Sequence, residues 1–324
     1  MPKAIRINKL GGPDVMRWEE VEVGKPGPGE VRVRHTAIGL NFIDVYDRTG
    51  LYPLDLPSGL GREAAGVVEA VGRKVRGLKR GDRVAYTYPV AGAYAEMRIC
   101  PAERLVKVPA GITDEQAAAM MLKGLTAQYL LRQTYRVKRG DTGADSFSGG
   151  RRRFDRRAVG AASRCESDRC SRQLGEGEAR QAQRLPSRHR RRTRAVAGRG
   201  QVADRWRRRA RRLRFGRQGY VLRFARQPAS TGMMVSFGNS SGPVPAIAPL
   251  ELGRRGSLFL TRPSLFNYVA TRTALERAAR ELFNVVKRGA VRIRIGQSYP
   301  LQDVATAHRD LEARRTTGST ILIP

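Results

Sequence analysis

The stretch from Leu56 to Gly72 reads L-P-S-G-L-G-R-E-A-A-G-V-V-E-A-V-G, a compact apolar run behind a cluster of Pro, Ser and Gly. A short apolar run bounded by turn residues predicts a buried strand. Similar runs, each bounded by Gly, Pro or Asp, recur in the first 142 residues: K-A-I-R-I, E-V-R-V-R-H-T-A-I, D-R-V-A-Y, A-Y-A-E-M-R-I and R-L-V-K-V. Many short strands at close spacing predict a small, barrel-like β domain.

Helical and α/β patterns follow this predicted β domain. Thr113 is suited to cap a helix because Gln116 lies three residues later, and the residues up to Leu131 are largely apolar. A turn at Gly140 and Asp141 then marks the place for a first buried strand. The chain from residue 232 predicts further elements: a buried strand in G-M-M-V-S-F-G, a helix carrying Leu275, Ala279, Leu282, Phe283 and Val286 that stops at Gly289, a strand V-R-I-R-I, a helix Val304–Arg314 and a final strand S-T-I-L-I-P.

Length and composition limit the class of protein. A chain of 324 residues suggests two domains, at about 100–200 residues per domain. No apolar run reaches the roughly 18 residues of a membrane helix, and the N-terminus lacks the apolar block of a signal peptide, so we expect a cytoplasmic protein. The three cysteines, Cys100, Cys165 and Cys170, form no C-x-x-C pair and indicate neither a disulfide framework nor a zinc knuckle.

The net charge of +33 is concentrated in one segment. Residues 143–231 contain 26 arginines, no lysine and 7 acids, so they contribute 26 − 7 = +19 of the total. The same 89 residues include only 12 of the Val, Ile, Leu, Phe and Met class, which is too few to build a core. This segment, called the arginine-rich segment below, therefore differs from both of its flanks.

Both flanks resemble one protein family. The motifs are G-L-N-F-I-D-V-Y-D-R-T-G-L-Y-P (39–53), the stretch 56–72, L-K-G-L-T-A-Q-Y-L-L (122–131), G-M-M-V-S-F-G-N-S-S-G (232–242), L-T-R-P-S-L (260–265) and A-R-R-T-T-G-S-T-I-L-I-P at 313–324. They look like those of the zeta-crystallin-like quinone oxidoreductases, a zinc-free branch of the medium-chain dehydrogenase/reductase superfamily. The resemblance covers about 142 + 93 = 235 residues and omits the arginine-rich segment.

The resemblance implies an α/β protein of two domains. A GroES-like, β-rich catalytic domain would span residues 1–125 and 262–324, and a Rossmann-type, doubly wound nucleotide-binding domain would span residues 126–261. The implied activity is NADPH-dependent reduction of a small-molecule quinone by hydride transfer, in a homodimer. A related zinc-free reductase of enones or acyl thioesters is the alternative enzyme.

The residues at the family's zinc positions argue against a metal. Zinc-using relatives have a cysteine and a histidine where this chain has Asn41 and Arg62, and neither is a usual zinc ligand. Glu63 and Asp44 are potential ligands, but two carboxylates alone make a poor zinc site. We therefore expect no metal.

The resemblance also implies the residues of the site. Tyr46 and Tyr52 are the catalytic candidates, since either hydroxyl would donate a hydrogen bond to a quinone oxygen; tyrosines packed on a loop are the alternative. For Arg314 the alternative is an ordinary solvated helix end. The implied cofactor contacts are Asn41, Phe42, Tyr46, Tyr129, Phe237, Gly238, Asn239, Ser240, Thr261, Arg262 and Arg314.

The arginine-rich segment reads like a shifted reading frame. Here the family would have a turn such as H-A-A-A-G-G-V-G, whose bare backbone admits a pyrophosphate, whereas this chain has T-G-A-D-S-F-S-G-G-R-R-R. Back-translation read one nucleotide later from Gly143 permits V-L-I-H and then S-A-A-G-G-V-G. From Arg214 it permits D-S-V-G-K-D-T-F. Codons of the form GNC, which specify Gly, Ala, Val or Asp, become CGN when the frame is displaced, and every CGN codon specifies arginine. The AAR codons of lysine would seldom arise in this way, so the segment is rich in arginine and has no lysine.

Two consequences follow from this interpretation. Arginine-rich chain in place of central strands would remove most of the core of the nucleotide-binding domain, so we expect the chain as written neither to fold this domain nor to bind cofactor. The rival hypothesis is a genuine polyanion-binding insertion, because clustered arginines bind phosphate. Few aromatic residues are interleaved with the arginines for base stacking, so we expect only non-specific contact with nucleic acid.

Overall fold

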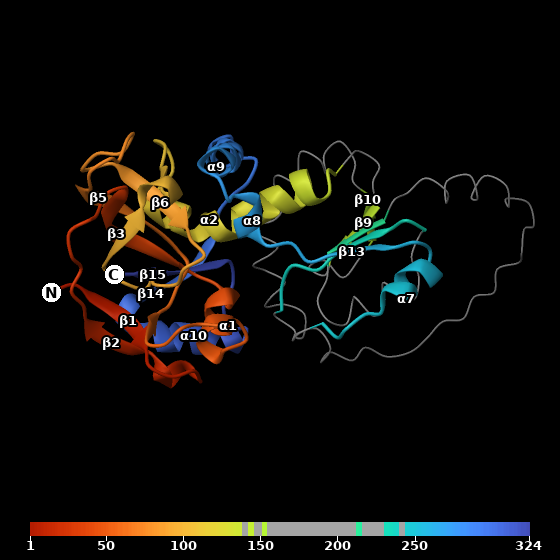
Figure 1. Cartoon of the computed structure of the whole chain (residues 1–324), viewed down its shortest axis with the longest axis horizontal. Coiled ribbons are helices and arrows are strands. Elements are labelled where there is room, and N and C mark those ends of the chain that lie inside the picture. The colour runs from red at the N-terminus through yellow and green to blue at the C-terminus, as the bar shows by residue number, and fades with distance from the viewer. Residues whose placement is uncertain (138–141, 146–150, 154–211, 216–229, 240–243) are drawn as a thin grey trace, which may run out of the picture. The chain divides into compact units, whose positions relative to one another are not determined.

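The computed structural model describes residues 1–137, 142–145, 151–153, 212–215, 230–239 and 244–324. These residues form two compact units (Figure 1). The described residues of 1–136 and 264–324 make up the first unit, called the catalytic unit below, and those of 137–263 make up the second. Across the described residues, no helix is both long and apolar enough to cross a bilayer.

The catalytic unit is built on a seven-stranded sheet. Its long central strand, β3 (Glu30–Leu40), pairs antiparallel with β5 (Glu63–Val71), β7 (Met97–Pro101) and β15 (Ser319–Ile323). The sheet continues through β6 (Arg83–Thr87) to β8 (Val106–Lys107), and β14 (Ile295–Pro300) lies at its other edge. A smaller sheet has the order β2 (Arg17–Glu20), β1 (Lys3–Ile7), β4 (Ser58–Gly59). The predicted β domain is thus confirmed.

An apolar core lies inside these sheets. It includes Ile5 and Ile7 from β1, Val33 and Ile38 from β3, and Val84 from β6, all at most 1% exposed. Residues from the C-terminal part of the chain join the same core, among them Leu301, Val304 and Leu322. Segments that are distant in sequence therefore fold as one body.

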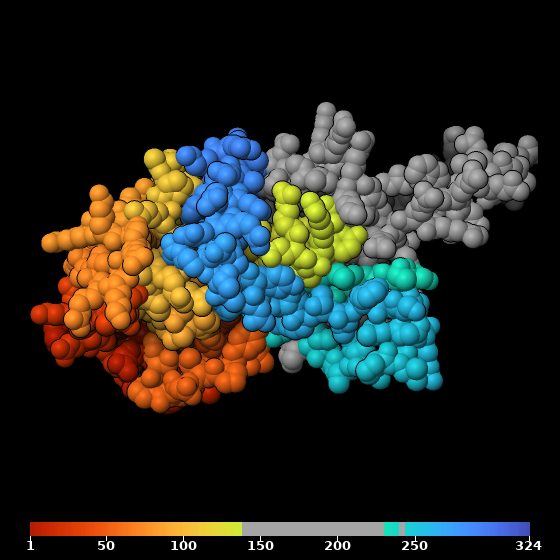
Figure 2. Space-filling model, turned by 45° about the horizontal axis from the view of Figure 1, so that its top comes forward, coloured from red at the N-terminus to blue at the C-terminus, as the bar shows by residue number. Residues whose placement is uncertain are grey.

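The helices of the catalytic unit follow their sequence patterns. The capping box at Thr113 and Gln116 starts α2 (Asp114–Tyr129), as predicted. It packs on α9 (Arg272–Lys287) at Gly124, where a Cβ atom would lie 2.7 Å from Leu282 Cδ1. Figure 2 shows α8 (Leu265–Tyr268) and α9, in blue, on the surface of the unit. The remaining helices are α1 (Phe42–Thr49) and α10 (Val304–Glu312), with single 3-10 turns at Pro13–Val15, Ala102–Arg104 and Leu301–Asp303 and a π turn at Leu130–Thr134.

One predicted strand was placed too early. The alternating residues of V-R-I-R-I suggest a strand over 291–295, but β14 begins only at Ile295. Its parallel partner β15 begins at Ser319, which pairs with Ile295, so earlier residues have no strand to pair with. The alternation of residue types could not show where the strand starts, because that depends on its hydrogen-bond partners.

The second unit contains a five-stranded sheet. Its strands lie in the order β10 (Arg151–Arg153), β9 (Thr142–Asp145), β11 (Arg212–Phe215), β12 (Met233–Val235), β13 (Phe259–Thr261). Four of them are parallel, and only β10 runs antiparallel to its neighbour. The strands predicted after Asp141 and within 232–238 are both present. A short helix, α7 (Pro249–Arg254), lies between β12 and β13 in the chain. The rest of the arginine-rich segment lies outside the described residues.

Candidate functional site

The end of β3 and the start of α1 form the centre of the candidate site. Asn41 lies between the two elements with extended backbone, and its N–H donates to Asp44 Oδ2 at 2.8 Å. That bond satisfies one of the free N–H groups at the start of the helix. α1 ends at Gly50, whose φ of 80° is the left-handed conformation that glycine favours. The short helix is therefore fixed at both ends.

Glu63, the first residue of β5, connects this junction to α2. Its carboxylate is fully buried and accepts from Asn41 Nδ2 at 2.7 Å and from Leu122 N at 2.5 Å. Lys123 Nζ lies 3.9 Å from the same carboxylate and donates to Leu40 O at 3.2 Å. Burial raises the pKa of Glu63, while Lys123 and the two N–H donors act in the opposite direction.

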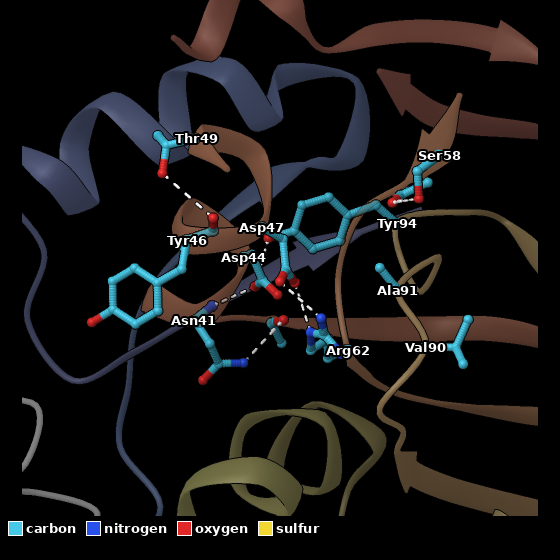
Figure 3. Close-up of polar contacts among 12 residues, drawn as sticks. Asn41, Asp44, Tyr46, Asp47, Thr49, Ser58, Arg62, Val90, Ala91 and Tyr94 are labelled. Carbon is cyan, nitrogen blue, oxygen red and sulfur yellow. Dashed lines mark hydrogen bonds and ion pairs between the residues drawn. The ribbon is translucent and has the colours of Figure 1, made fainter. Parts of the chain in front are cut away.

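A buried ion pair joins α1 to the loop before β5. The Arg62 guanidinium donates twice to the Asp47 carboxylate, at 2.6 and 2.8 Å, and Figure 3 shows this fork. Both side chains are at least nine-tenths buried. Bidentate geometry is what makes a buried Arg–carboxylate pair tolerable, because two charge-assisted bonds offset part of the lost hydration.

A second buried chain of polar groups runs from Asp44 to α10. The Tyr94 hydroxyl donates to Asp44 Oδ2 at 2.8 Å, so the His308 Nε2–H, 3.1 Å away, must donate to that hydroxyl. Either protonation state of the imidazole can donate from Nε2, and burial, which lowers the pKa of His308 to about 3, favours the neutral form. Burial, with the nearby Asp47 charge second, raises the pKa of Asp44 to about 7.

The predicted residues of the catalytic unit gather around this junction. Tyr46 is half-buried on α1, with the ring of Phe42 at 6.4 Å and that of Tyr52 edge-on at 5.4 Å. The Tyr52 N–H donates to Tyr46 O at 3.3 Å. Asn41, Phe42, Tyr46 and Tyr52 therefore form one aromatic and amide cluster.

Two other predicted residues of this unit lie apart in the fold. Tyr129, at the end of α2, is 2% exposed and stacks on Tyr268 with ring centroids 4.4 Å apart. Arg314 follows α10 with a φ of 57°, and its N–H donates to Leu311 O at 3.1 Å. The Arg314 backbone thus closes a helix end. Their roles toward a cofactor stay predictions.

The predicted residues of the second unit meet at the ends of β12 and β13. The Ser236 N–H donates to Thr261 O at 2.9 Å, which holds the two strand ends together. Arg262 donates to Ser236 O at 3.0 Å and to Asn239 Oδ1 at 3.3 Å. Phe237 and Gly238 lie between these residues, and Ser240 lies outside the described residues. Carboxyl ends of parallel strands are where ligands of α/β folds bind.

The buried polar and ionisable side chains are the part of the site that the motifs did not assign. Asp47, Tyr94 and His308 were not among the candidates, and Glu63 and Asp44 entered only as potential zinc ligands. Their signal was a set of charged residues within apolar runs, as in F-I-D-V-Y-D-R (42–48). Among the described residues, no group of three or more His, Cys, Asp or Glu side chains is placed to hold a metal ion.

Comparison with known proteins assigns the family. Residues 27–110 match the alcohol dehydrogenase GroES-like domain, and residues 218–322 match the zinc-binding dehydrogenase model. The whole chain is 43% identical to the whole of a quinone oxidoreductase from Pseudomonas aeruginosa, and 38% identical to 99% of a 2-haloacrylate reductase from a Burkholderia species. The crystal structure of Escherichia coli quinone oxidoreductase complexed with NADPH superimposes with a TM-score of 0.80, at 36% identity over 99% of this chain and all of that one. The chain therefore belongs to the quinone oxidoreductases of the medium-chain dehydrogenase/reductase superfamily, with a GroES-like domain and a Rossmann-type domain.

Proposed function

We propose that the function built into this chain is the NADPH-dependent reduction of a quinone without a catalytic metal. The observation that carries the proposal is the Asn41, Phe42, Tyr46 and Tyr52 cluster, held by Glu63 and by the buried Arg62–Asp47 pair. The Arg62 guanidinium supplies a fixed positive charge and binds the Asp47 carboxylate in an ion pair. The relative solved with NADPH supports the same cofactor here.

The described residues fit the nicotinamide end of such a cofactor. The Ser236 hydroxyl is buried at the end of β12 without a hydrogen-bond partner among the described residues, beside the Arg262 and Asn239 contacts. A buried, unpartnered hydroxyl at this position suits a ribose or carboxamide group. The residues after Asp141 do not fit the pyrophosphate, because T-G-A-D-S-F-S-G-G-R-R-R lacks the family's turn.

The chemistry divides between cofactor and chain. NADPH, when bound, supplies the hydride. The chain's own contribution is to orient the ligand at Asn41, to cover it with Phe42 and Tyr46, and to donate a hydrogen bond from Tyr46 or Tyr52 to the quinone oxygen on which charge develops. No acid or base of the chain is required, because the reduced quinone oxygens take their protons from solvent.

Partners and location are part of the same proposal. We expect a homodimer, as the family implies, and a cytoplasmic location, with contacts to nucleic acid limited to generic charge attraction by the arginine-rich segment. Reduction of an activated alkene is the second candidate function. The likeness to a 2-haloacrylate reductase favours that candidate.

One pair of proteins tests the proposal. The chain as written and a chain with the reading frame restored across residues 143–231 are titrated with NADPH, and their turnover of 1,4-benzoquinone is compared with that of 2-alkenals and 2-haloacrylates. We expect saturable, micromolar binding and quinone turnover only in the restored chain. Micromolar binding by the chain as written would contradict the frame interpretation, and a restored chain that prefers the alkenes would replace the quinone proposal.

A further inference from the structure

The two ends of the Asn41 side-chain amide bind different ligand groups. The nitrogen donates two hydrogen bonds, whereas the oxygen only accepts. Asn41 is 5% exposed and lies between β3 and α1, next to Phe42 and one helical turn from Tyr46. The end of this amide that faces the site therefore decides whether the site recognises a donor or an acceptor.

Glu63 is the closer of two acceptors that orient that amide, since Asn41 Nδ2 also donates to Gly39 O at 3.5 Å. Asn41 Nδ2 lies 2.7 Å from Glu63 Oε1, and the Leu122 N–H lies 2.5 Å from Glu63 Oε2. A carboxylate accepts hydrogen bonds and does not donate them, so the amide must turn its nitrogen toward Glu63. The Lys123 ammonium 3.9 Å away favours the ionised form of Glu63.

The Asn41 side-chain oxygen then faces the opposite direction. In Figure 3 it is turned away from the dashed bond of the amide nitrogen, toward the side of the view on which Tyr46 lies. The Asp44 N–H donates to the main-chain oxygen of Asn41 at 3.1 Å. Asn41 and Asp44 stand in capping-box positions, but the Asn41 side chain makes no cap hydrogen bond. We propose that Glu63 is a positioning residue that holds the Asn41 side-chain oxygen outward, as an acceptor for an N–H or O–H group of the bound ligand.

The ligand class follows from the proposed function, on which this step rests. A nicotinamide carboxamide and a ribose hydroxyl both carry donors that suit an amide oxygen. An outward amide nitrogen would instead face those donors with another donor. Glu63 therefore sets the polarity of the contact without touching the ligand itself.

The backbone of α2 makes the orientation testable. Leu122 N–H belongs to the backbone of α2 and cannot turn over, so in Glu63→Gln the new side chain must give its only oxygen to Leu122. The side-chain nitrogen of the introduced glutamine then faces Asn41, and the Asn41 amide has to reverse. The Glu63→Gln substitution, which keeps the shape of the side chain, is thus expected to turn the Asn41 side-chain nitrogen away from position 63 and toward the site.

The experiment measures solvent exchange of the Asn41 side-chain NH2 by NMR. Labelling with ¹⁵N-asparagine gives five side-chain amides, from Asn8, Asn41, Asn239, Asn267 and Asn284, and Asn41→Asp identifies one of them by its loss. In the full chain as it is, we expect slow exchange for Asn41. In Glu63→Gln we expect exchange faster by about tenfold or more, with Asn8, Asn267 and Asn284 unchanged.

Glu69→Gln is the matched control, because it makes the same substitution on the same strand at a carboxylate that pairs with Arg32 instead. It is expected to leave Asn41 exchange unchanged. Fast exchange of Asn41 in the unsubstituted chain overturns the proposal even if Glu63→Gln fails to fold, and so does unchanged exchange in a folded Glu63→Gln variant. The measurement needs no cofactor, so it is independent of whether NADPH binds.

Discussion

The two units of the molecule accommodate arginine in opposite ways. In the catalytic unit, Arg62 and Arg48 are nearly fully buried, and each has an acidic partner: Asp47 at 2.6 Å and Glu312 at 2.7 Å. In the second unit, the register pairs the Cα of Arg214 on the central strand β11 with that of the buried Met234. The arginine-rich segment has 7 acids for 26 arginines, so most of its arginines have no acid within the segment.

The difference shows what a buried cation needs. Taking a charge out of water costs several kcal/mol, and a well-placed counter-charge with two hydrogen bonds offsets most of that cost. The catalytic unit supplies such a partner for Arg62, whereas Arg48 makes one bond to Glu312 and its buried Nε and Nη1 have no hydrogen-bond partner among the described residues. The arginine-rich segment supplies too few, as expected of codons read in a displaced frame.

The largest effect is expected from breaking a partnered arginine. Arg62→Met leaves the Asp47 carboxylate buried without its counter-charge, which should lower the unfolding free energy of the catalytic unit by about 3–5 kcal/mol. Urea unfolding followed by Trp18 fluorescence measures this, in a Trp206→Phe background that leaves one tryptophan.

Two controls make that result specific. Arg32→Met removes the half-exposed pair with Glu69 and should cost no more than about 1 kcal/mol. Removing both partners, in Arg62→Met with Asp47→Leu, should recover most of the stability because no charge is left unpaired. A double variant as unstable as Arg62→Met would show that packing, and not the unpaired carboxylate, sets the cost.

An intermediate effect is expected from pH, through Asp44. Its pKa is raised to about 7 when folded, against an ordinary value of 3.8, so it stabilises the fold most below about pH 4 and this stabilisation is lost as the pH rises to about 7. His35 and His308, with pKa values lowered to about 4 and about 3, act oppositely and destabilise as the pH falls below 6.5. Comparison with Asp44→Asn separates the contribution of Asp44 to stability from that of the two histidines.

The stability of the unsubstituted chain relative to Asp44→Asn should therefore increase as the pH falls from 7 to 4. Urea midpoints at several pH values measure the difference. Asp47 and Glu63 contribute to the raised pKa, so their own variants should reduce the slope. A difference that does not change with pH would mean that Asp44 keeps an ordinary pKa in the folded protein.

The smallest effect is expected from replacing an arginine of the central strand β11. Arg214→Met places an apolar residue beside Met234 in the parallel sheet, and it should leave stability unchanged or raise it by about 1 kcal/mol. Hydrogen exchange of the Met233–Val235 amides measures the change. Marked loss of protection would show that Arg214 has a partner, and the contrast between the units would then fail for this residue.

The parts of the fold that could be predicted are those set by local patterns. Turn-bounded apolar runs predicted β1, β3 and β5, and the capping box predicted the start of α2. The start of β14 was wrong because it depends on Ser319 of another strand. The aromatic residues of the site came from family motifs. Its buried polar network could not be found this way, since Asn41 and Glu63 are 22 positions apart, and Tyr94 and His308 are 214 apart.

The insertion of β15 between β14 and β3 has a consequence for protein synthesis. The sheet begun by the first hundred codons is completed only when a ribosome has translated codons 319–323 in the original frame. A frame displaced after codon 142 and never recovered would remove β14, β15, α9 and α10 together. Under the frame hypothesis, a second compensating nucleotide change near codon 231 would be what preserves the catalytic unit.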